Sequence, residues 1–246
     1  GYEEAASQGL IAGINAARKL QGKEGIVIDR SQGYIGVLID DLVTKESHEP
    51  YRMMTSRAEY RLLLRQDNAD MRLTKIGYEV GLIDEERYQK LLKKEEMIEK
   101  EIERVEHTNV GTTEAVQALL ESYESTPLTS GTTLAELIRR PELSYEKIAP
   151  IDKHRKELPY DVKEQVDINI KYDGYIKRQM RQVEQFKKLE NKRIPENINY
   201  DEIQSLRLEA KQKLNQIRPS SIGQASRISG VSPADVSVLL VYLSSK

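Results

Sequence analysis

The sequence predicts a mainly α-helical fold. Apolar residues recur at steps of three and four along every long segment of the 246-residue chain. Turns that contain proline or glycine separate these segments, for example at Thr126-Pro127 and Arg140-Pro141. We therefore expect at most a few short strand residues.

Residues 1–18 predict the first helix, which has small side chains on one face. Ala5, Gly9, Gly13 and Ala17 follow each other at steps of four, a spacing that lets a second layer approach the helix closely. The simplest interpretation is the last helix of a preceding α/β domain whose sheet lies upstream, although a short amphipathic helix of any helical domain has the same spacing. Because the chain begins at Gly1 inside this pattern, we expect a C-terminal fragment of a longer protein.

Residues 34–43 fit two kinds of secondary structure. Their β-branched side chains favour a strand, whereas paired acids and aliphatic residues at three- and four-residue steps favour a helix. We favour the helix.

The segment from residue 49 to 65 predicts a helix with its own start signal. Ser56 followed three residues later by Glu59 has the pattern of a capping box, in which each side chain satisfies a free backbone amide. The consecutive residues Leu62 to Leu64 would supply the buried side.

Three arginines in this segment are spaced so that a helix would stack them on one face. Arg57, Arg61 and Arg65 stand at i, i+4 and i+8. A guanidinium is a planar fork suited to bidentate contact with phosphate, which suggests a nucleic-acid backbone or another phosphorylated ligand. A solvated network of salt bridges to Glu59, Asp67 and neighbouring acids would produce the same pattern.

The remaining helical patterns lie further along the chain. Residues 84–106 predict a long exposed helix, whose charges we interpret as a solvated face without function. Shorter patterns cover residues 113–123, 133–139 and 145–148, and a second long helix is predicted over residues 161–190.

The latter part of this second long helix is basic. Residues 171–193 carry eight Lys or Arg against three acids. Tyr172 and Tyr175 accompany this patch at a spacing of three. Such tyrosines can stack on nucleic-acid bases, but an aromatic pair at this spacing is more often part of the core, and we favour the core position.

Residues 221–240 have the pattern of a helix-turn-helix. Gly230 marks the turn, Ser232 is the expected cap of the second helix, and Pro233 occupies its favoured first position. The second helix lacks Arg, Lys, Asn and Gln, the side chains that read base edges. A small docking hairpin is therefore favoured over a DNA-reading motif.

Composition excludes several classes of function. The net charge is only −2 with 32% charged residues, so attraction to nucleic acid would have to come from local patches. There is no cysteine, which rules out disulfides, thiolate zinc sites and thiol catalysis within the chain. The three histidines, among them His48, have no ligand spacing, and no apolar run reaches the length of a membrane span. We expect no metal, no membrane contact and a cytoplasmic location.

Three blocks of sequence resemble the C-terminal portion of the MnmG/GidA family. They are residues 1–6, the stretch from residue 49 to 70, and residues 222–231, and they occur in the family's order. The resemblance implies an FAD-dependent enzyme that uses NADH and methylenetetrahydrofolate. With the GTPase MnmE, such an enzyme adds a carboxymethylaminomethyl group to the wobble uridine of tRNA. The chain lacks both a G-x-G-x-x-G fingerprint and cysteine, so the resemblance places the chemistry upstream, and no cofactor is expected on this fragment.

The resemblance also implies roles for individual positions. The expected cofactor-binding residues, close to FAD, are Gly1, Tyr2, Glu3 and Glu4. The expected tRNA-binding residues are Arg52, Arg57, Arg61, Arg65, Lys171, Tyr172, Tyr175, Arg178 and Arg181. The expected MnmE-binding residues are Gly223, Gln224, Arg227 and Gly230. The chain departs from the family at Ser205-Leu206-Arg207, where Gly-Leu-Ser is usual, and at Met54, where phenylalanine is usual.

The expected domain organisation follows. Residues 1–20 are the end of the FAD-binding domain, and residues 21–83 form a connecting region that carries the tRNA-facing arginines. Residues 84–220 form a helical domain, and residues 221–246 form the C-terminal helical hairpin. The full-length form is expected to be a homodimer. A helix-turn-helix DNA-binding regulator and a protein-interaction scaffold without RNA affinity are the alternatives.

Overall fold

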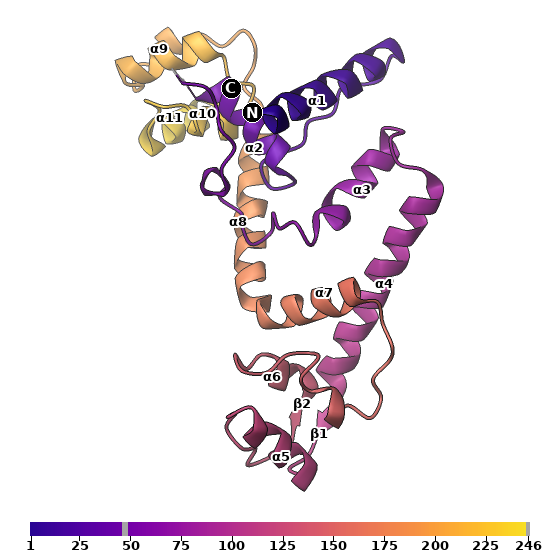
Figure 1. Ribbon diagram of the computed structural model, residues 1–246. Coiled ribbons are helices and arrows are strands. Elements are labelled where there is room, and N and C mark those ends of the chain that lie inside the picture. The colour runs from indigo at the N-terminus through magenta and orange to yellow at the C-terminus, as the bar shows by residue number, and fades with distance from the viewer. Residues whose placement is uncertain (46–48, 245–246) are drawn as a thin grey trace. The chain divides into compact units, whose positions relative to one another are not determined.

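The computed structural model describes residues 1–45 and 49–244, and it confirms the mainly α-helical fold. These residues form eleven α-helices, three 3₁₀ turns and two strands of two residues each (Figure 1). His48 lies outside the described residues. None of the described helices combines the length and the apolar character that a membrane span needs. The chain divides into two compact units, Gly1–Leu64 with Gln179–Lys246, and Arg65–Arg178.

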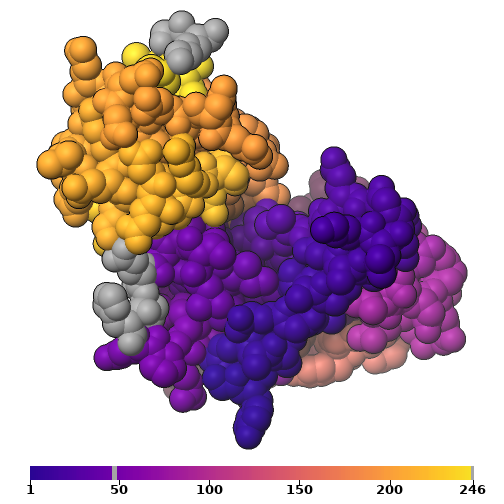
Figure 2. Space-filling view, turned by 90° about the horizontal axis from the view of Figure 1, so that it is seen from above, coloured from indigo at the N-terminus to yellow at the C-terminus, as the bar shows by residue number. Residues whose placement is uncertain are grey.

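The first unit contains both ends of the chain. Its helices are α1 (Tyr2–Leu20), α2 (Tyr34–Thr44), the later part of α8 (Asp173–Asn191), α9 (Leu208–Ile217), α10 (Ile222–Ser226) and α11 (Pro233–Ser244), and its 3₁₀ turns are η1 (Thr55–Arg57) and η3 (Tyr200–Glu202). The helix favoured for residues 34–43 is therefore confirmed as α2. α10 contacts α2, and Figure 2 shows the yellow terminal helices beside the purple segment that contains α2.

Gly36 explains how α2 packs against the segment that precedes it. A Cβ atom built on Gly36 would lie 2.3 Å from the carbonyl oxygens of Ile28 and Asp29. Only glycine leaves room for this backbone-to-backbone approach. The segment that ends at Arg30 is thereby held directly against the start of α2.

The terminal helix-turn-helix is confirmed. Its core includes Tyr200, Leu214, Ile222 and Leu239, all fully buried. Gly230 makes the turn with φ +94°, a left-handed conformation that favours glycine.

The second unit is organised around one long helix. Its elements are α3 (Ala69–Glu79), α4 (Glu85–His107), β1 (Asn109–Val110), α5 (Glu114–Ser122), β2 (Thr132–Thr133), α6 (Leu134–Ile138), η2 (Ala149–Ile151) and α7 (Tyr160–Lys171). The strands pair antiparallel, with Asn109 opposite Thr133. α4 begins at its cap Asp84, whose carboxylate accepts the Arg87 amide, and α3, α6 and α7 all contact it (Figure 1).

Two charged residues of α4 correct the expectation of a wholly solvated face. Lys94 is buried between Asp70 and Asp161, with Nζ 2.8 Å and 3.0 Å from their carboxylate oxygens. Glu101 is also buried, and it accepts hydrogen bonds from Arg104 and from the Tyr145 hydroxyl. These charges stabilise the fold because each is paired where it is buried.

The helix expected at residues 145–148 does not form. The chain makes turns there and continues into η2, because Pro150 cannot extend a helix and restricts the residue before it. Tyr145 is held by side chains instead: its amide donates to Asp167 Oδ1 at 2.7 Å.

The single helix expected over residues 161–190 is two helices. α7 ends at Lys171 and α8 begins at Asp173, with Tyr172 between them at φ −103° and ψ 12°. Asp173 lies in the first turn of α8, where a carboxylate is favoured by the helix dipole, and it also pairs with Lys177. Position 173 thus serves as a helix start.

Candidate nucleic-acid interface

The arginine-rich segment is an extended loop, which corrects the predicted helix and its row of stacked arginines. The one helical element that the structure assigns in this segment is the 3₁₀ turn η1, and Met54 and Ala58 on either side of it have extended backbones. The Ser56–Glu59 capping box does not form, because Glu59 accepts hydrogen bonds from Arg30, with Nη2 2.8 Å from Oε1. We call residues 51–61 the arginine loop.

Apolar side chains fix the arginine loop to the first unit. Ala58, Tyr60 and Leu64 are buried, and Ala58 and Leu64 pack with Val37 of α2. The Tyr60 ring meets the Phe186 ring edge-on, with 6.1 Å between centroids. Burial at positions 58 and 60 with an exposed residue 59 between them is the alternation of an extended chain.

The Arg57 guanidinium is held in a fixed, half-exposed position. It lies over the Tyr51 ring at 4.3 Å from the centroid, and its Nε donates to the Arg52 carbonyl at 2.9 Å. Tyr51 in turn donates its hydroxyl to Asp41 Oδ2 at 2.8 Å. Burial and this hydrogen bond raise the pKa of Tyr51, so the hydroxyl stays a donor to higher pH than that of an ordinary tyrosine. Arg57 is thus a pre-ordered cation.

Arg52 and Arg61 extend this cationic surface. Arg52 is 75% exposed, and its Nε lies 3.9 Å from Glu4 Oε1. Arg61 is exposed and forms no ion pair with any residue that the structure describes. The arginine loop therefore presents three guanidiniums, of which one is ordered by stacking and two reach solvent.

Arg65 does not belong to this surface. It lies in the second unit and is largely buried, with Nη2 3.0 Å from Asp67 Oδ2 and 3.3 Å from Gln165 Oε1. Gln165 also donates to Asp67, so the three side chains form one closed group. The geometry at Arg65 therefore agrees with the alternative interpretation of the arginine pattern, a salt-bridge network.

The aromatic and basic residues around the start of α8 are accessible. Tyr172 is 45% and Tyr175 is 65% exposed, so the favoured core position was wrong for both. Arg178 and Arg181 are exposed and have no ion-pair partner among the described residues, whereas Lys171 lies 3.7 Å from Asp167. Exposed tyrosines beside unpaired arginines are suited to stacking on unpaired bases and contacting phosphates.

The two units differ in charge. By sequence, the first unit has 19 Lys and Arg against 16 Asp and Glu, and the second has 19 against 24. A polyanion would therefore be attracted to the first unit, which carries the arginine loop.

The start of α1 offers little that could bind a cofactor. Gly1, Tyr2 and Glu3 are exposed, but Glu4 is buried and its Oε1 accepts the Met53 amide at 2.8 Å. Its carboxylate thus connects α1 to the arginine loop. The small-residue face of α1 is open to solvent among the described residues, and a Cβ built on Gly9 or Gly13 would meet nothing within 4 Å.

The hairpin residues expected to bind a partner hold the hairpin in place. Arg227 is largely buried and grips Asp40 through two hydrogen bonds, of 2.6 Å from Nε and 2.7 Å from Nη2, and it also pairs with Glu190. A Cβ on Gly223 would lie 1.9 Å from Glu190 Oε1, and Gln224 accepts the Ser220 amide at 2.7 Å. With Gly230 at the turn, all four positions fix the packing of α10.

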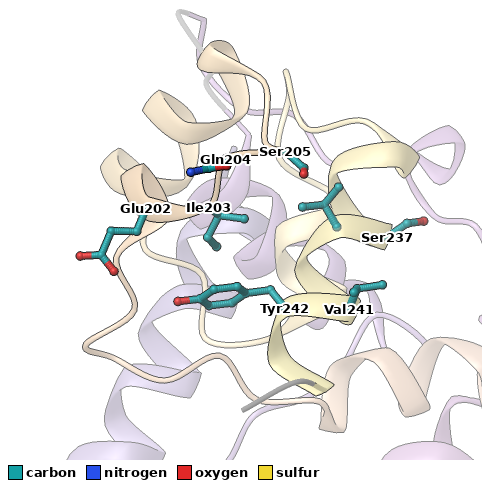
Figure 3. Close-up of a pocket in the computed structure, with 8 residues that line it drawn as sticks. Glu202, Ile203, Gln204, Ser205, Ser237, Val241 and Tyr242 are labelled. Atoms are coloured by element: carbon teal, nitrogen blue, oxygen red, sulfur yellow. The ribbon is translucent and has the colours of Figure 1, made fainter.

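An apolar cavity opens on the surface of the hairpin, and no pattern in the sequence predicted it. It has a volume of about 430 Å³ and is lined by Glu202, Ile203, Gln204, Ser205, Ser237, Val238, Val241 and Tyr242. Figure 3 shows the Tyr242 ring and the Ile203 side chain on facing sides of it. Val241 is exposed on α11, whose apolar residues surround the helix axis, and this all-round pattern is the signal that could have indicated a covered surface. No cation lines the cavity, so it does not suit phosphate.

Family models match most of the chain. The tRNA modifying enzyme MnmG/GidA C-terminal helical domain matches residues 85–180, and the MnmG/GidA C-terminal helical bundle matches residues 182–246. A third model, glucose inhibited division protein A, matches residues 1–24.

Curated and solved relatives agree with these models. The tRNA uridine 5-carboxymethylaminomethyl modification enzymes MnmG of Lachnoclostridium phytofermentans and Caldicellulosiruptor saccharolyticus are 71% and 65% identical over 99% of the chain. The chain spans 39% of the length of each. The solved GidA of Aquifex aeolicus in its form II crystal is 43% identical, with a TM-score of 0.85 over 99% of this chain and 38% of that one.

Proposed function

The chain belongs to the MnmG/GidA family, and we propose that it is the tRNA- and partner-binding part of an enzyme that modifies the wobble uridine of tRNA. In this proposal the full-length enzyme adds a carboxymethylaminomethyl group together with the GTPase MnmE, uses FAD and NADH, and works as a cytoplasmic homodimer. The chemistry belongs to the part of the relatives that this chain does not span.

The observation that carries the proposal is the arginine loop. Arg57 is ordered on Tyr51, while Arg52 and Arg61 reach solvent beside it in sequence, and all three lie in the unit with a surplus of cations. The guanidinium of Arg57 is already ordered, so it loses little side-chain entropy on binding phosphate, and the two exposed cations add charge for contact with an RNA backbone. We assign Arg52, Arg57 and Arg61 to that contact.

A second contact is proposed at the start of α8. Tyr172, Tyr175 and Arg178 of the second unit are exposed there, and the described residues give Arg178 no ion-pair partner. Arg181, which is also exposed and unpaired among the described residues, belongs to the first unit. RNA recognition depends on stacking of unpaired bases on aromatic rings and on cationic contacts to phosphate. An unpaired stretch of tRNA fits these side chains better than a duplex does.

The described residues do not fit FAD by themselves. The sequence has no G-x-G-x-x-G loop to hold a pyrophosphate, and the Glu4 carboxylate is occupied by the Met53 amide. Gly1, Tyr2, Glu3 and Glu4 can at most border a cofactor that the rest of the enzyme binds. FAD in the full-length enzyme would supply redox chemistry, and the open face of α1 would meet the domain that holds it.

The hairpin is proposed to dock MnmE, through the apolar cavity and not through Arg227. The accessible side chains of α11 include Ala234, Ser237 and Val241, which are small or apolar and cannot read base edges. This observation disfavours the DNA-binding regulator. The scaffold without RNA affinity is disfavoured by the pre-ordered arginine loop.

A binding titration with the full-length protein tests the proposed function. Fluorescence anisotropy is measured with labelled tRNA, with labelled duplex DNA of similar length, and with each labelled nucleic acid in the absence of protein. We expect saturable binding to tRNA that weakens linearly with the logarithm of salt concentration, and much weaker binding to the duplex. Equal affinity for both nucleic acids would support the regulator, and no affinity for either would support the scaffold.

A further inference from the structure

We propose that Arg30 is a positioning residue for RNA binding, which holds the arginine loop so that Arg57 and Arg61 face the ligand. The inference rests on the proposed contact of the arginine loop with tRNA. Arg30 itself would not touch RNA, because only 2% of its surface is exposed.

Arg30 joins α2 to the arginine loop from the inside. On one side Nη1 lies 2.6 Å from Asp41 Oδ1 and 2.9 Å from Asp40 Oδ2. On the other side Nη2 lies 2.8 Å from Glu59 Oε1 and donates to the Arg57 carbonyl at 3.2 Å. The Arg30 guanidinium therefore binds both the backbone carbonyl of Arg57 and the side chain of Glu59.

These bonds matter because the arginine loop has little regular structure of its own. Apart from the single turn η1, it makes no helical or strand hydrogen-bond ladder. Among the described residues, three sets of hydrogen bonds join the loop to the rest of the unit. They are the bonds from Arg30, the bond from Tyr51 to Asp41 and the bond from the Met53 amide to Glu4. Of these, only the Arg30 bonds act on the stretch between Arg57 and Arg61.

The chemistry of the site requires arginine. A buried cation must be balanced by anions, and Asp40, Asp41 and Glu59 supply them. The planar fork reaches carboxylates on two sides and a carbonyl at the same time, which the single ammonium of lysine cannot do. The position therefore combines a charge requirement with a geometric one.

The test compares two Glu→Gln substitutions in the full-length protein. Glu59→Gln removes the charged acceptor by which Arg30 holds the loop, at a side chain that is 48% exposed, so the fold should persist. Glu196→Gln is the matched control: Glu196 is an exposed acid of the same unit, and among the described residues it has no ion pair or hydrogen bond to Arg30, to Asp40 or to the arginine loop. Arg30→Lys is the third variant.

The measured quantity is the slope of log affinity for tRNA against log salt concentration. This slope counts phosphate contacts of the folded protein, so a loss of stability alone does not change it. We expect Glu59→Gln and Arg30→Lys to lower its magnitude by up to about two units, one for each displaced arginine, and Glu196→Gln to leave it unchanged. Unfolding curves of each variant, recorded in parallel, give the fraction of the protein that is folded under the binding conditions.

Three results separate failure of this inference from failure of the proposed function. If Glu59→Gln keeps the full slope while Arg61→Ala lowers it, the loop binds RNA and Arg30 does not position it. If the Glu196→Gln slope falls as far as the Glu59→Gln slope, the effect is general to the unit and the inference is also overturned. If the unsubstituted protein shows no salt-dependent binding to tRNA, the proposed function fails and this inference with it.

Discussion

The Arg207 guanidinium holds the Asp235 carboxylate at the start of α11. Nη2 and Nε lie 2.6 Å and 3.0 Å from Asp235 Oδ2, and Nη2 also donates to the Gly230 carbonyl at 2.9 Å. Asp235 is buried and accepts the Ser232 amide at 2.8 Å as well. Arg207, the position where the MnmG/GidA resemblance leads one to expect serine, therefore ties the segment before α9 to the turn of the hairpin.

The substitution Asp235→Asn should destabilise the hairpin. It removes the charge that Arg207 and Ser232 share, and the loss of charged hydrogen bonds to a buried carboxylate costs roughly 2 kcal/mol in the free energy of unfolding. Urea unfolding followed by circular dichroism measures the change. The control is Glu196→Gln, an exposed acid in the same unit, which should stay within about 0.5 kcal/mol of the unsubstituted protein.

The pH dependence of this difference has a defined sign. The Arg207 hydrogen bond, followed by those of Ser232, holds the pKa of Asp235 well below its usual range. The unfolded chain therefore binds a proton near pH 4 that the folded chain does not bind, and the stabilisation is present above that pH and is lost as the pH falls through the folded pKa. Unfolding midpoints of the unsubstituted protein and Asp235→Asn should differ at neutral pH and converge below about pH 4. A gap that widens in acid would contradict this assignment.

Two glycine substitutions should have opposite effects. Gly36→Ala places a methyl group 2.3 Å from two backbone carbonyl oxygens, which cannot move without shifting the segment that carries Arg30, so we expect a loss of about 1–3 kcal/mol in the free energy of unfolding. Gly13→Ala meets nothing within 4 Å on α1 and should stabilise the 246-residue chain by up to about 1 kcal/mol. Urea unfolding of both variants measures this. Equal changes in the free energy of unfolding would mean that the close backbone approach at Gly36 does not contribute to stability.

Local patterns in the sequence were sufficient for the elements that contain their own signals. The three- and four-residue steps around Leu91 and Ile98 predict α4, and its cap Asp84 begins the helix as the sequence indicates. The turn at Gly230 and the cap at Ser232 likewise indicate the hairpin, because each acts on residues close in sequence.

Contacts between distant residues account for what the sequence did not reveal. The Ser56–Glu59 pattern is a valid helix start, but Glu59 pairs with Arg30, 29 residues earlier, and this pairing accompanies the extended loop in place of a helix. Arg227 grips Asp40, 187 residues away, and this contact was not predicted. Neither pairing can be predicted from the spacing of residues that are close together in the sequence.

The central claim, that the arginine loop contacts tRNA, is tested most directly by the salt dependence of tRNA affinity in two double variants of the full-length protein. Arg52→Ala with Arg61→Ala removes two exposed cations of the loop, and Lys75→Ala with Lys93→Ala removes two exposed cations of the acidic second unit. The account predicts that the loop variant lowers the magnitude of the slope by about two units with an unchanged unfolding midpoint, while the lysine variant keeps the slope of the unsubstituted protein. Equal slopes for the loop variant and the unsubstituted protein would contradict the claim.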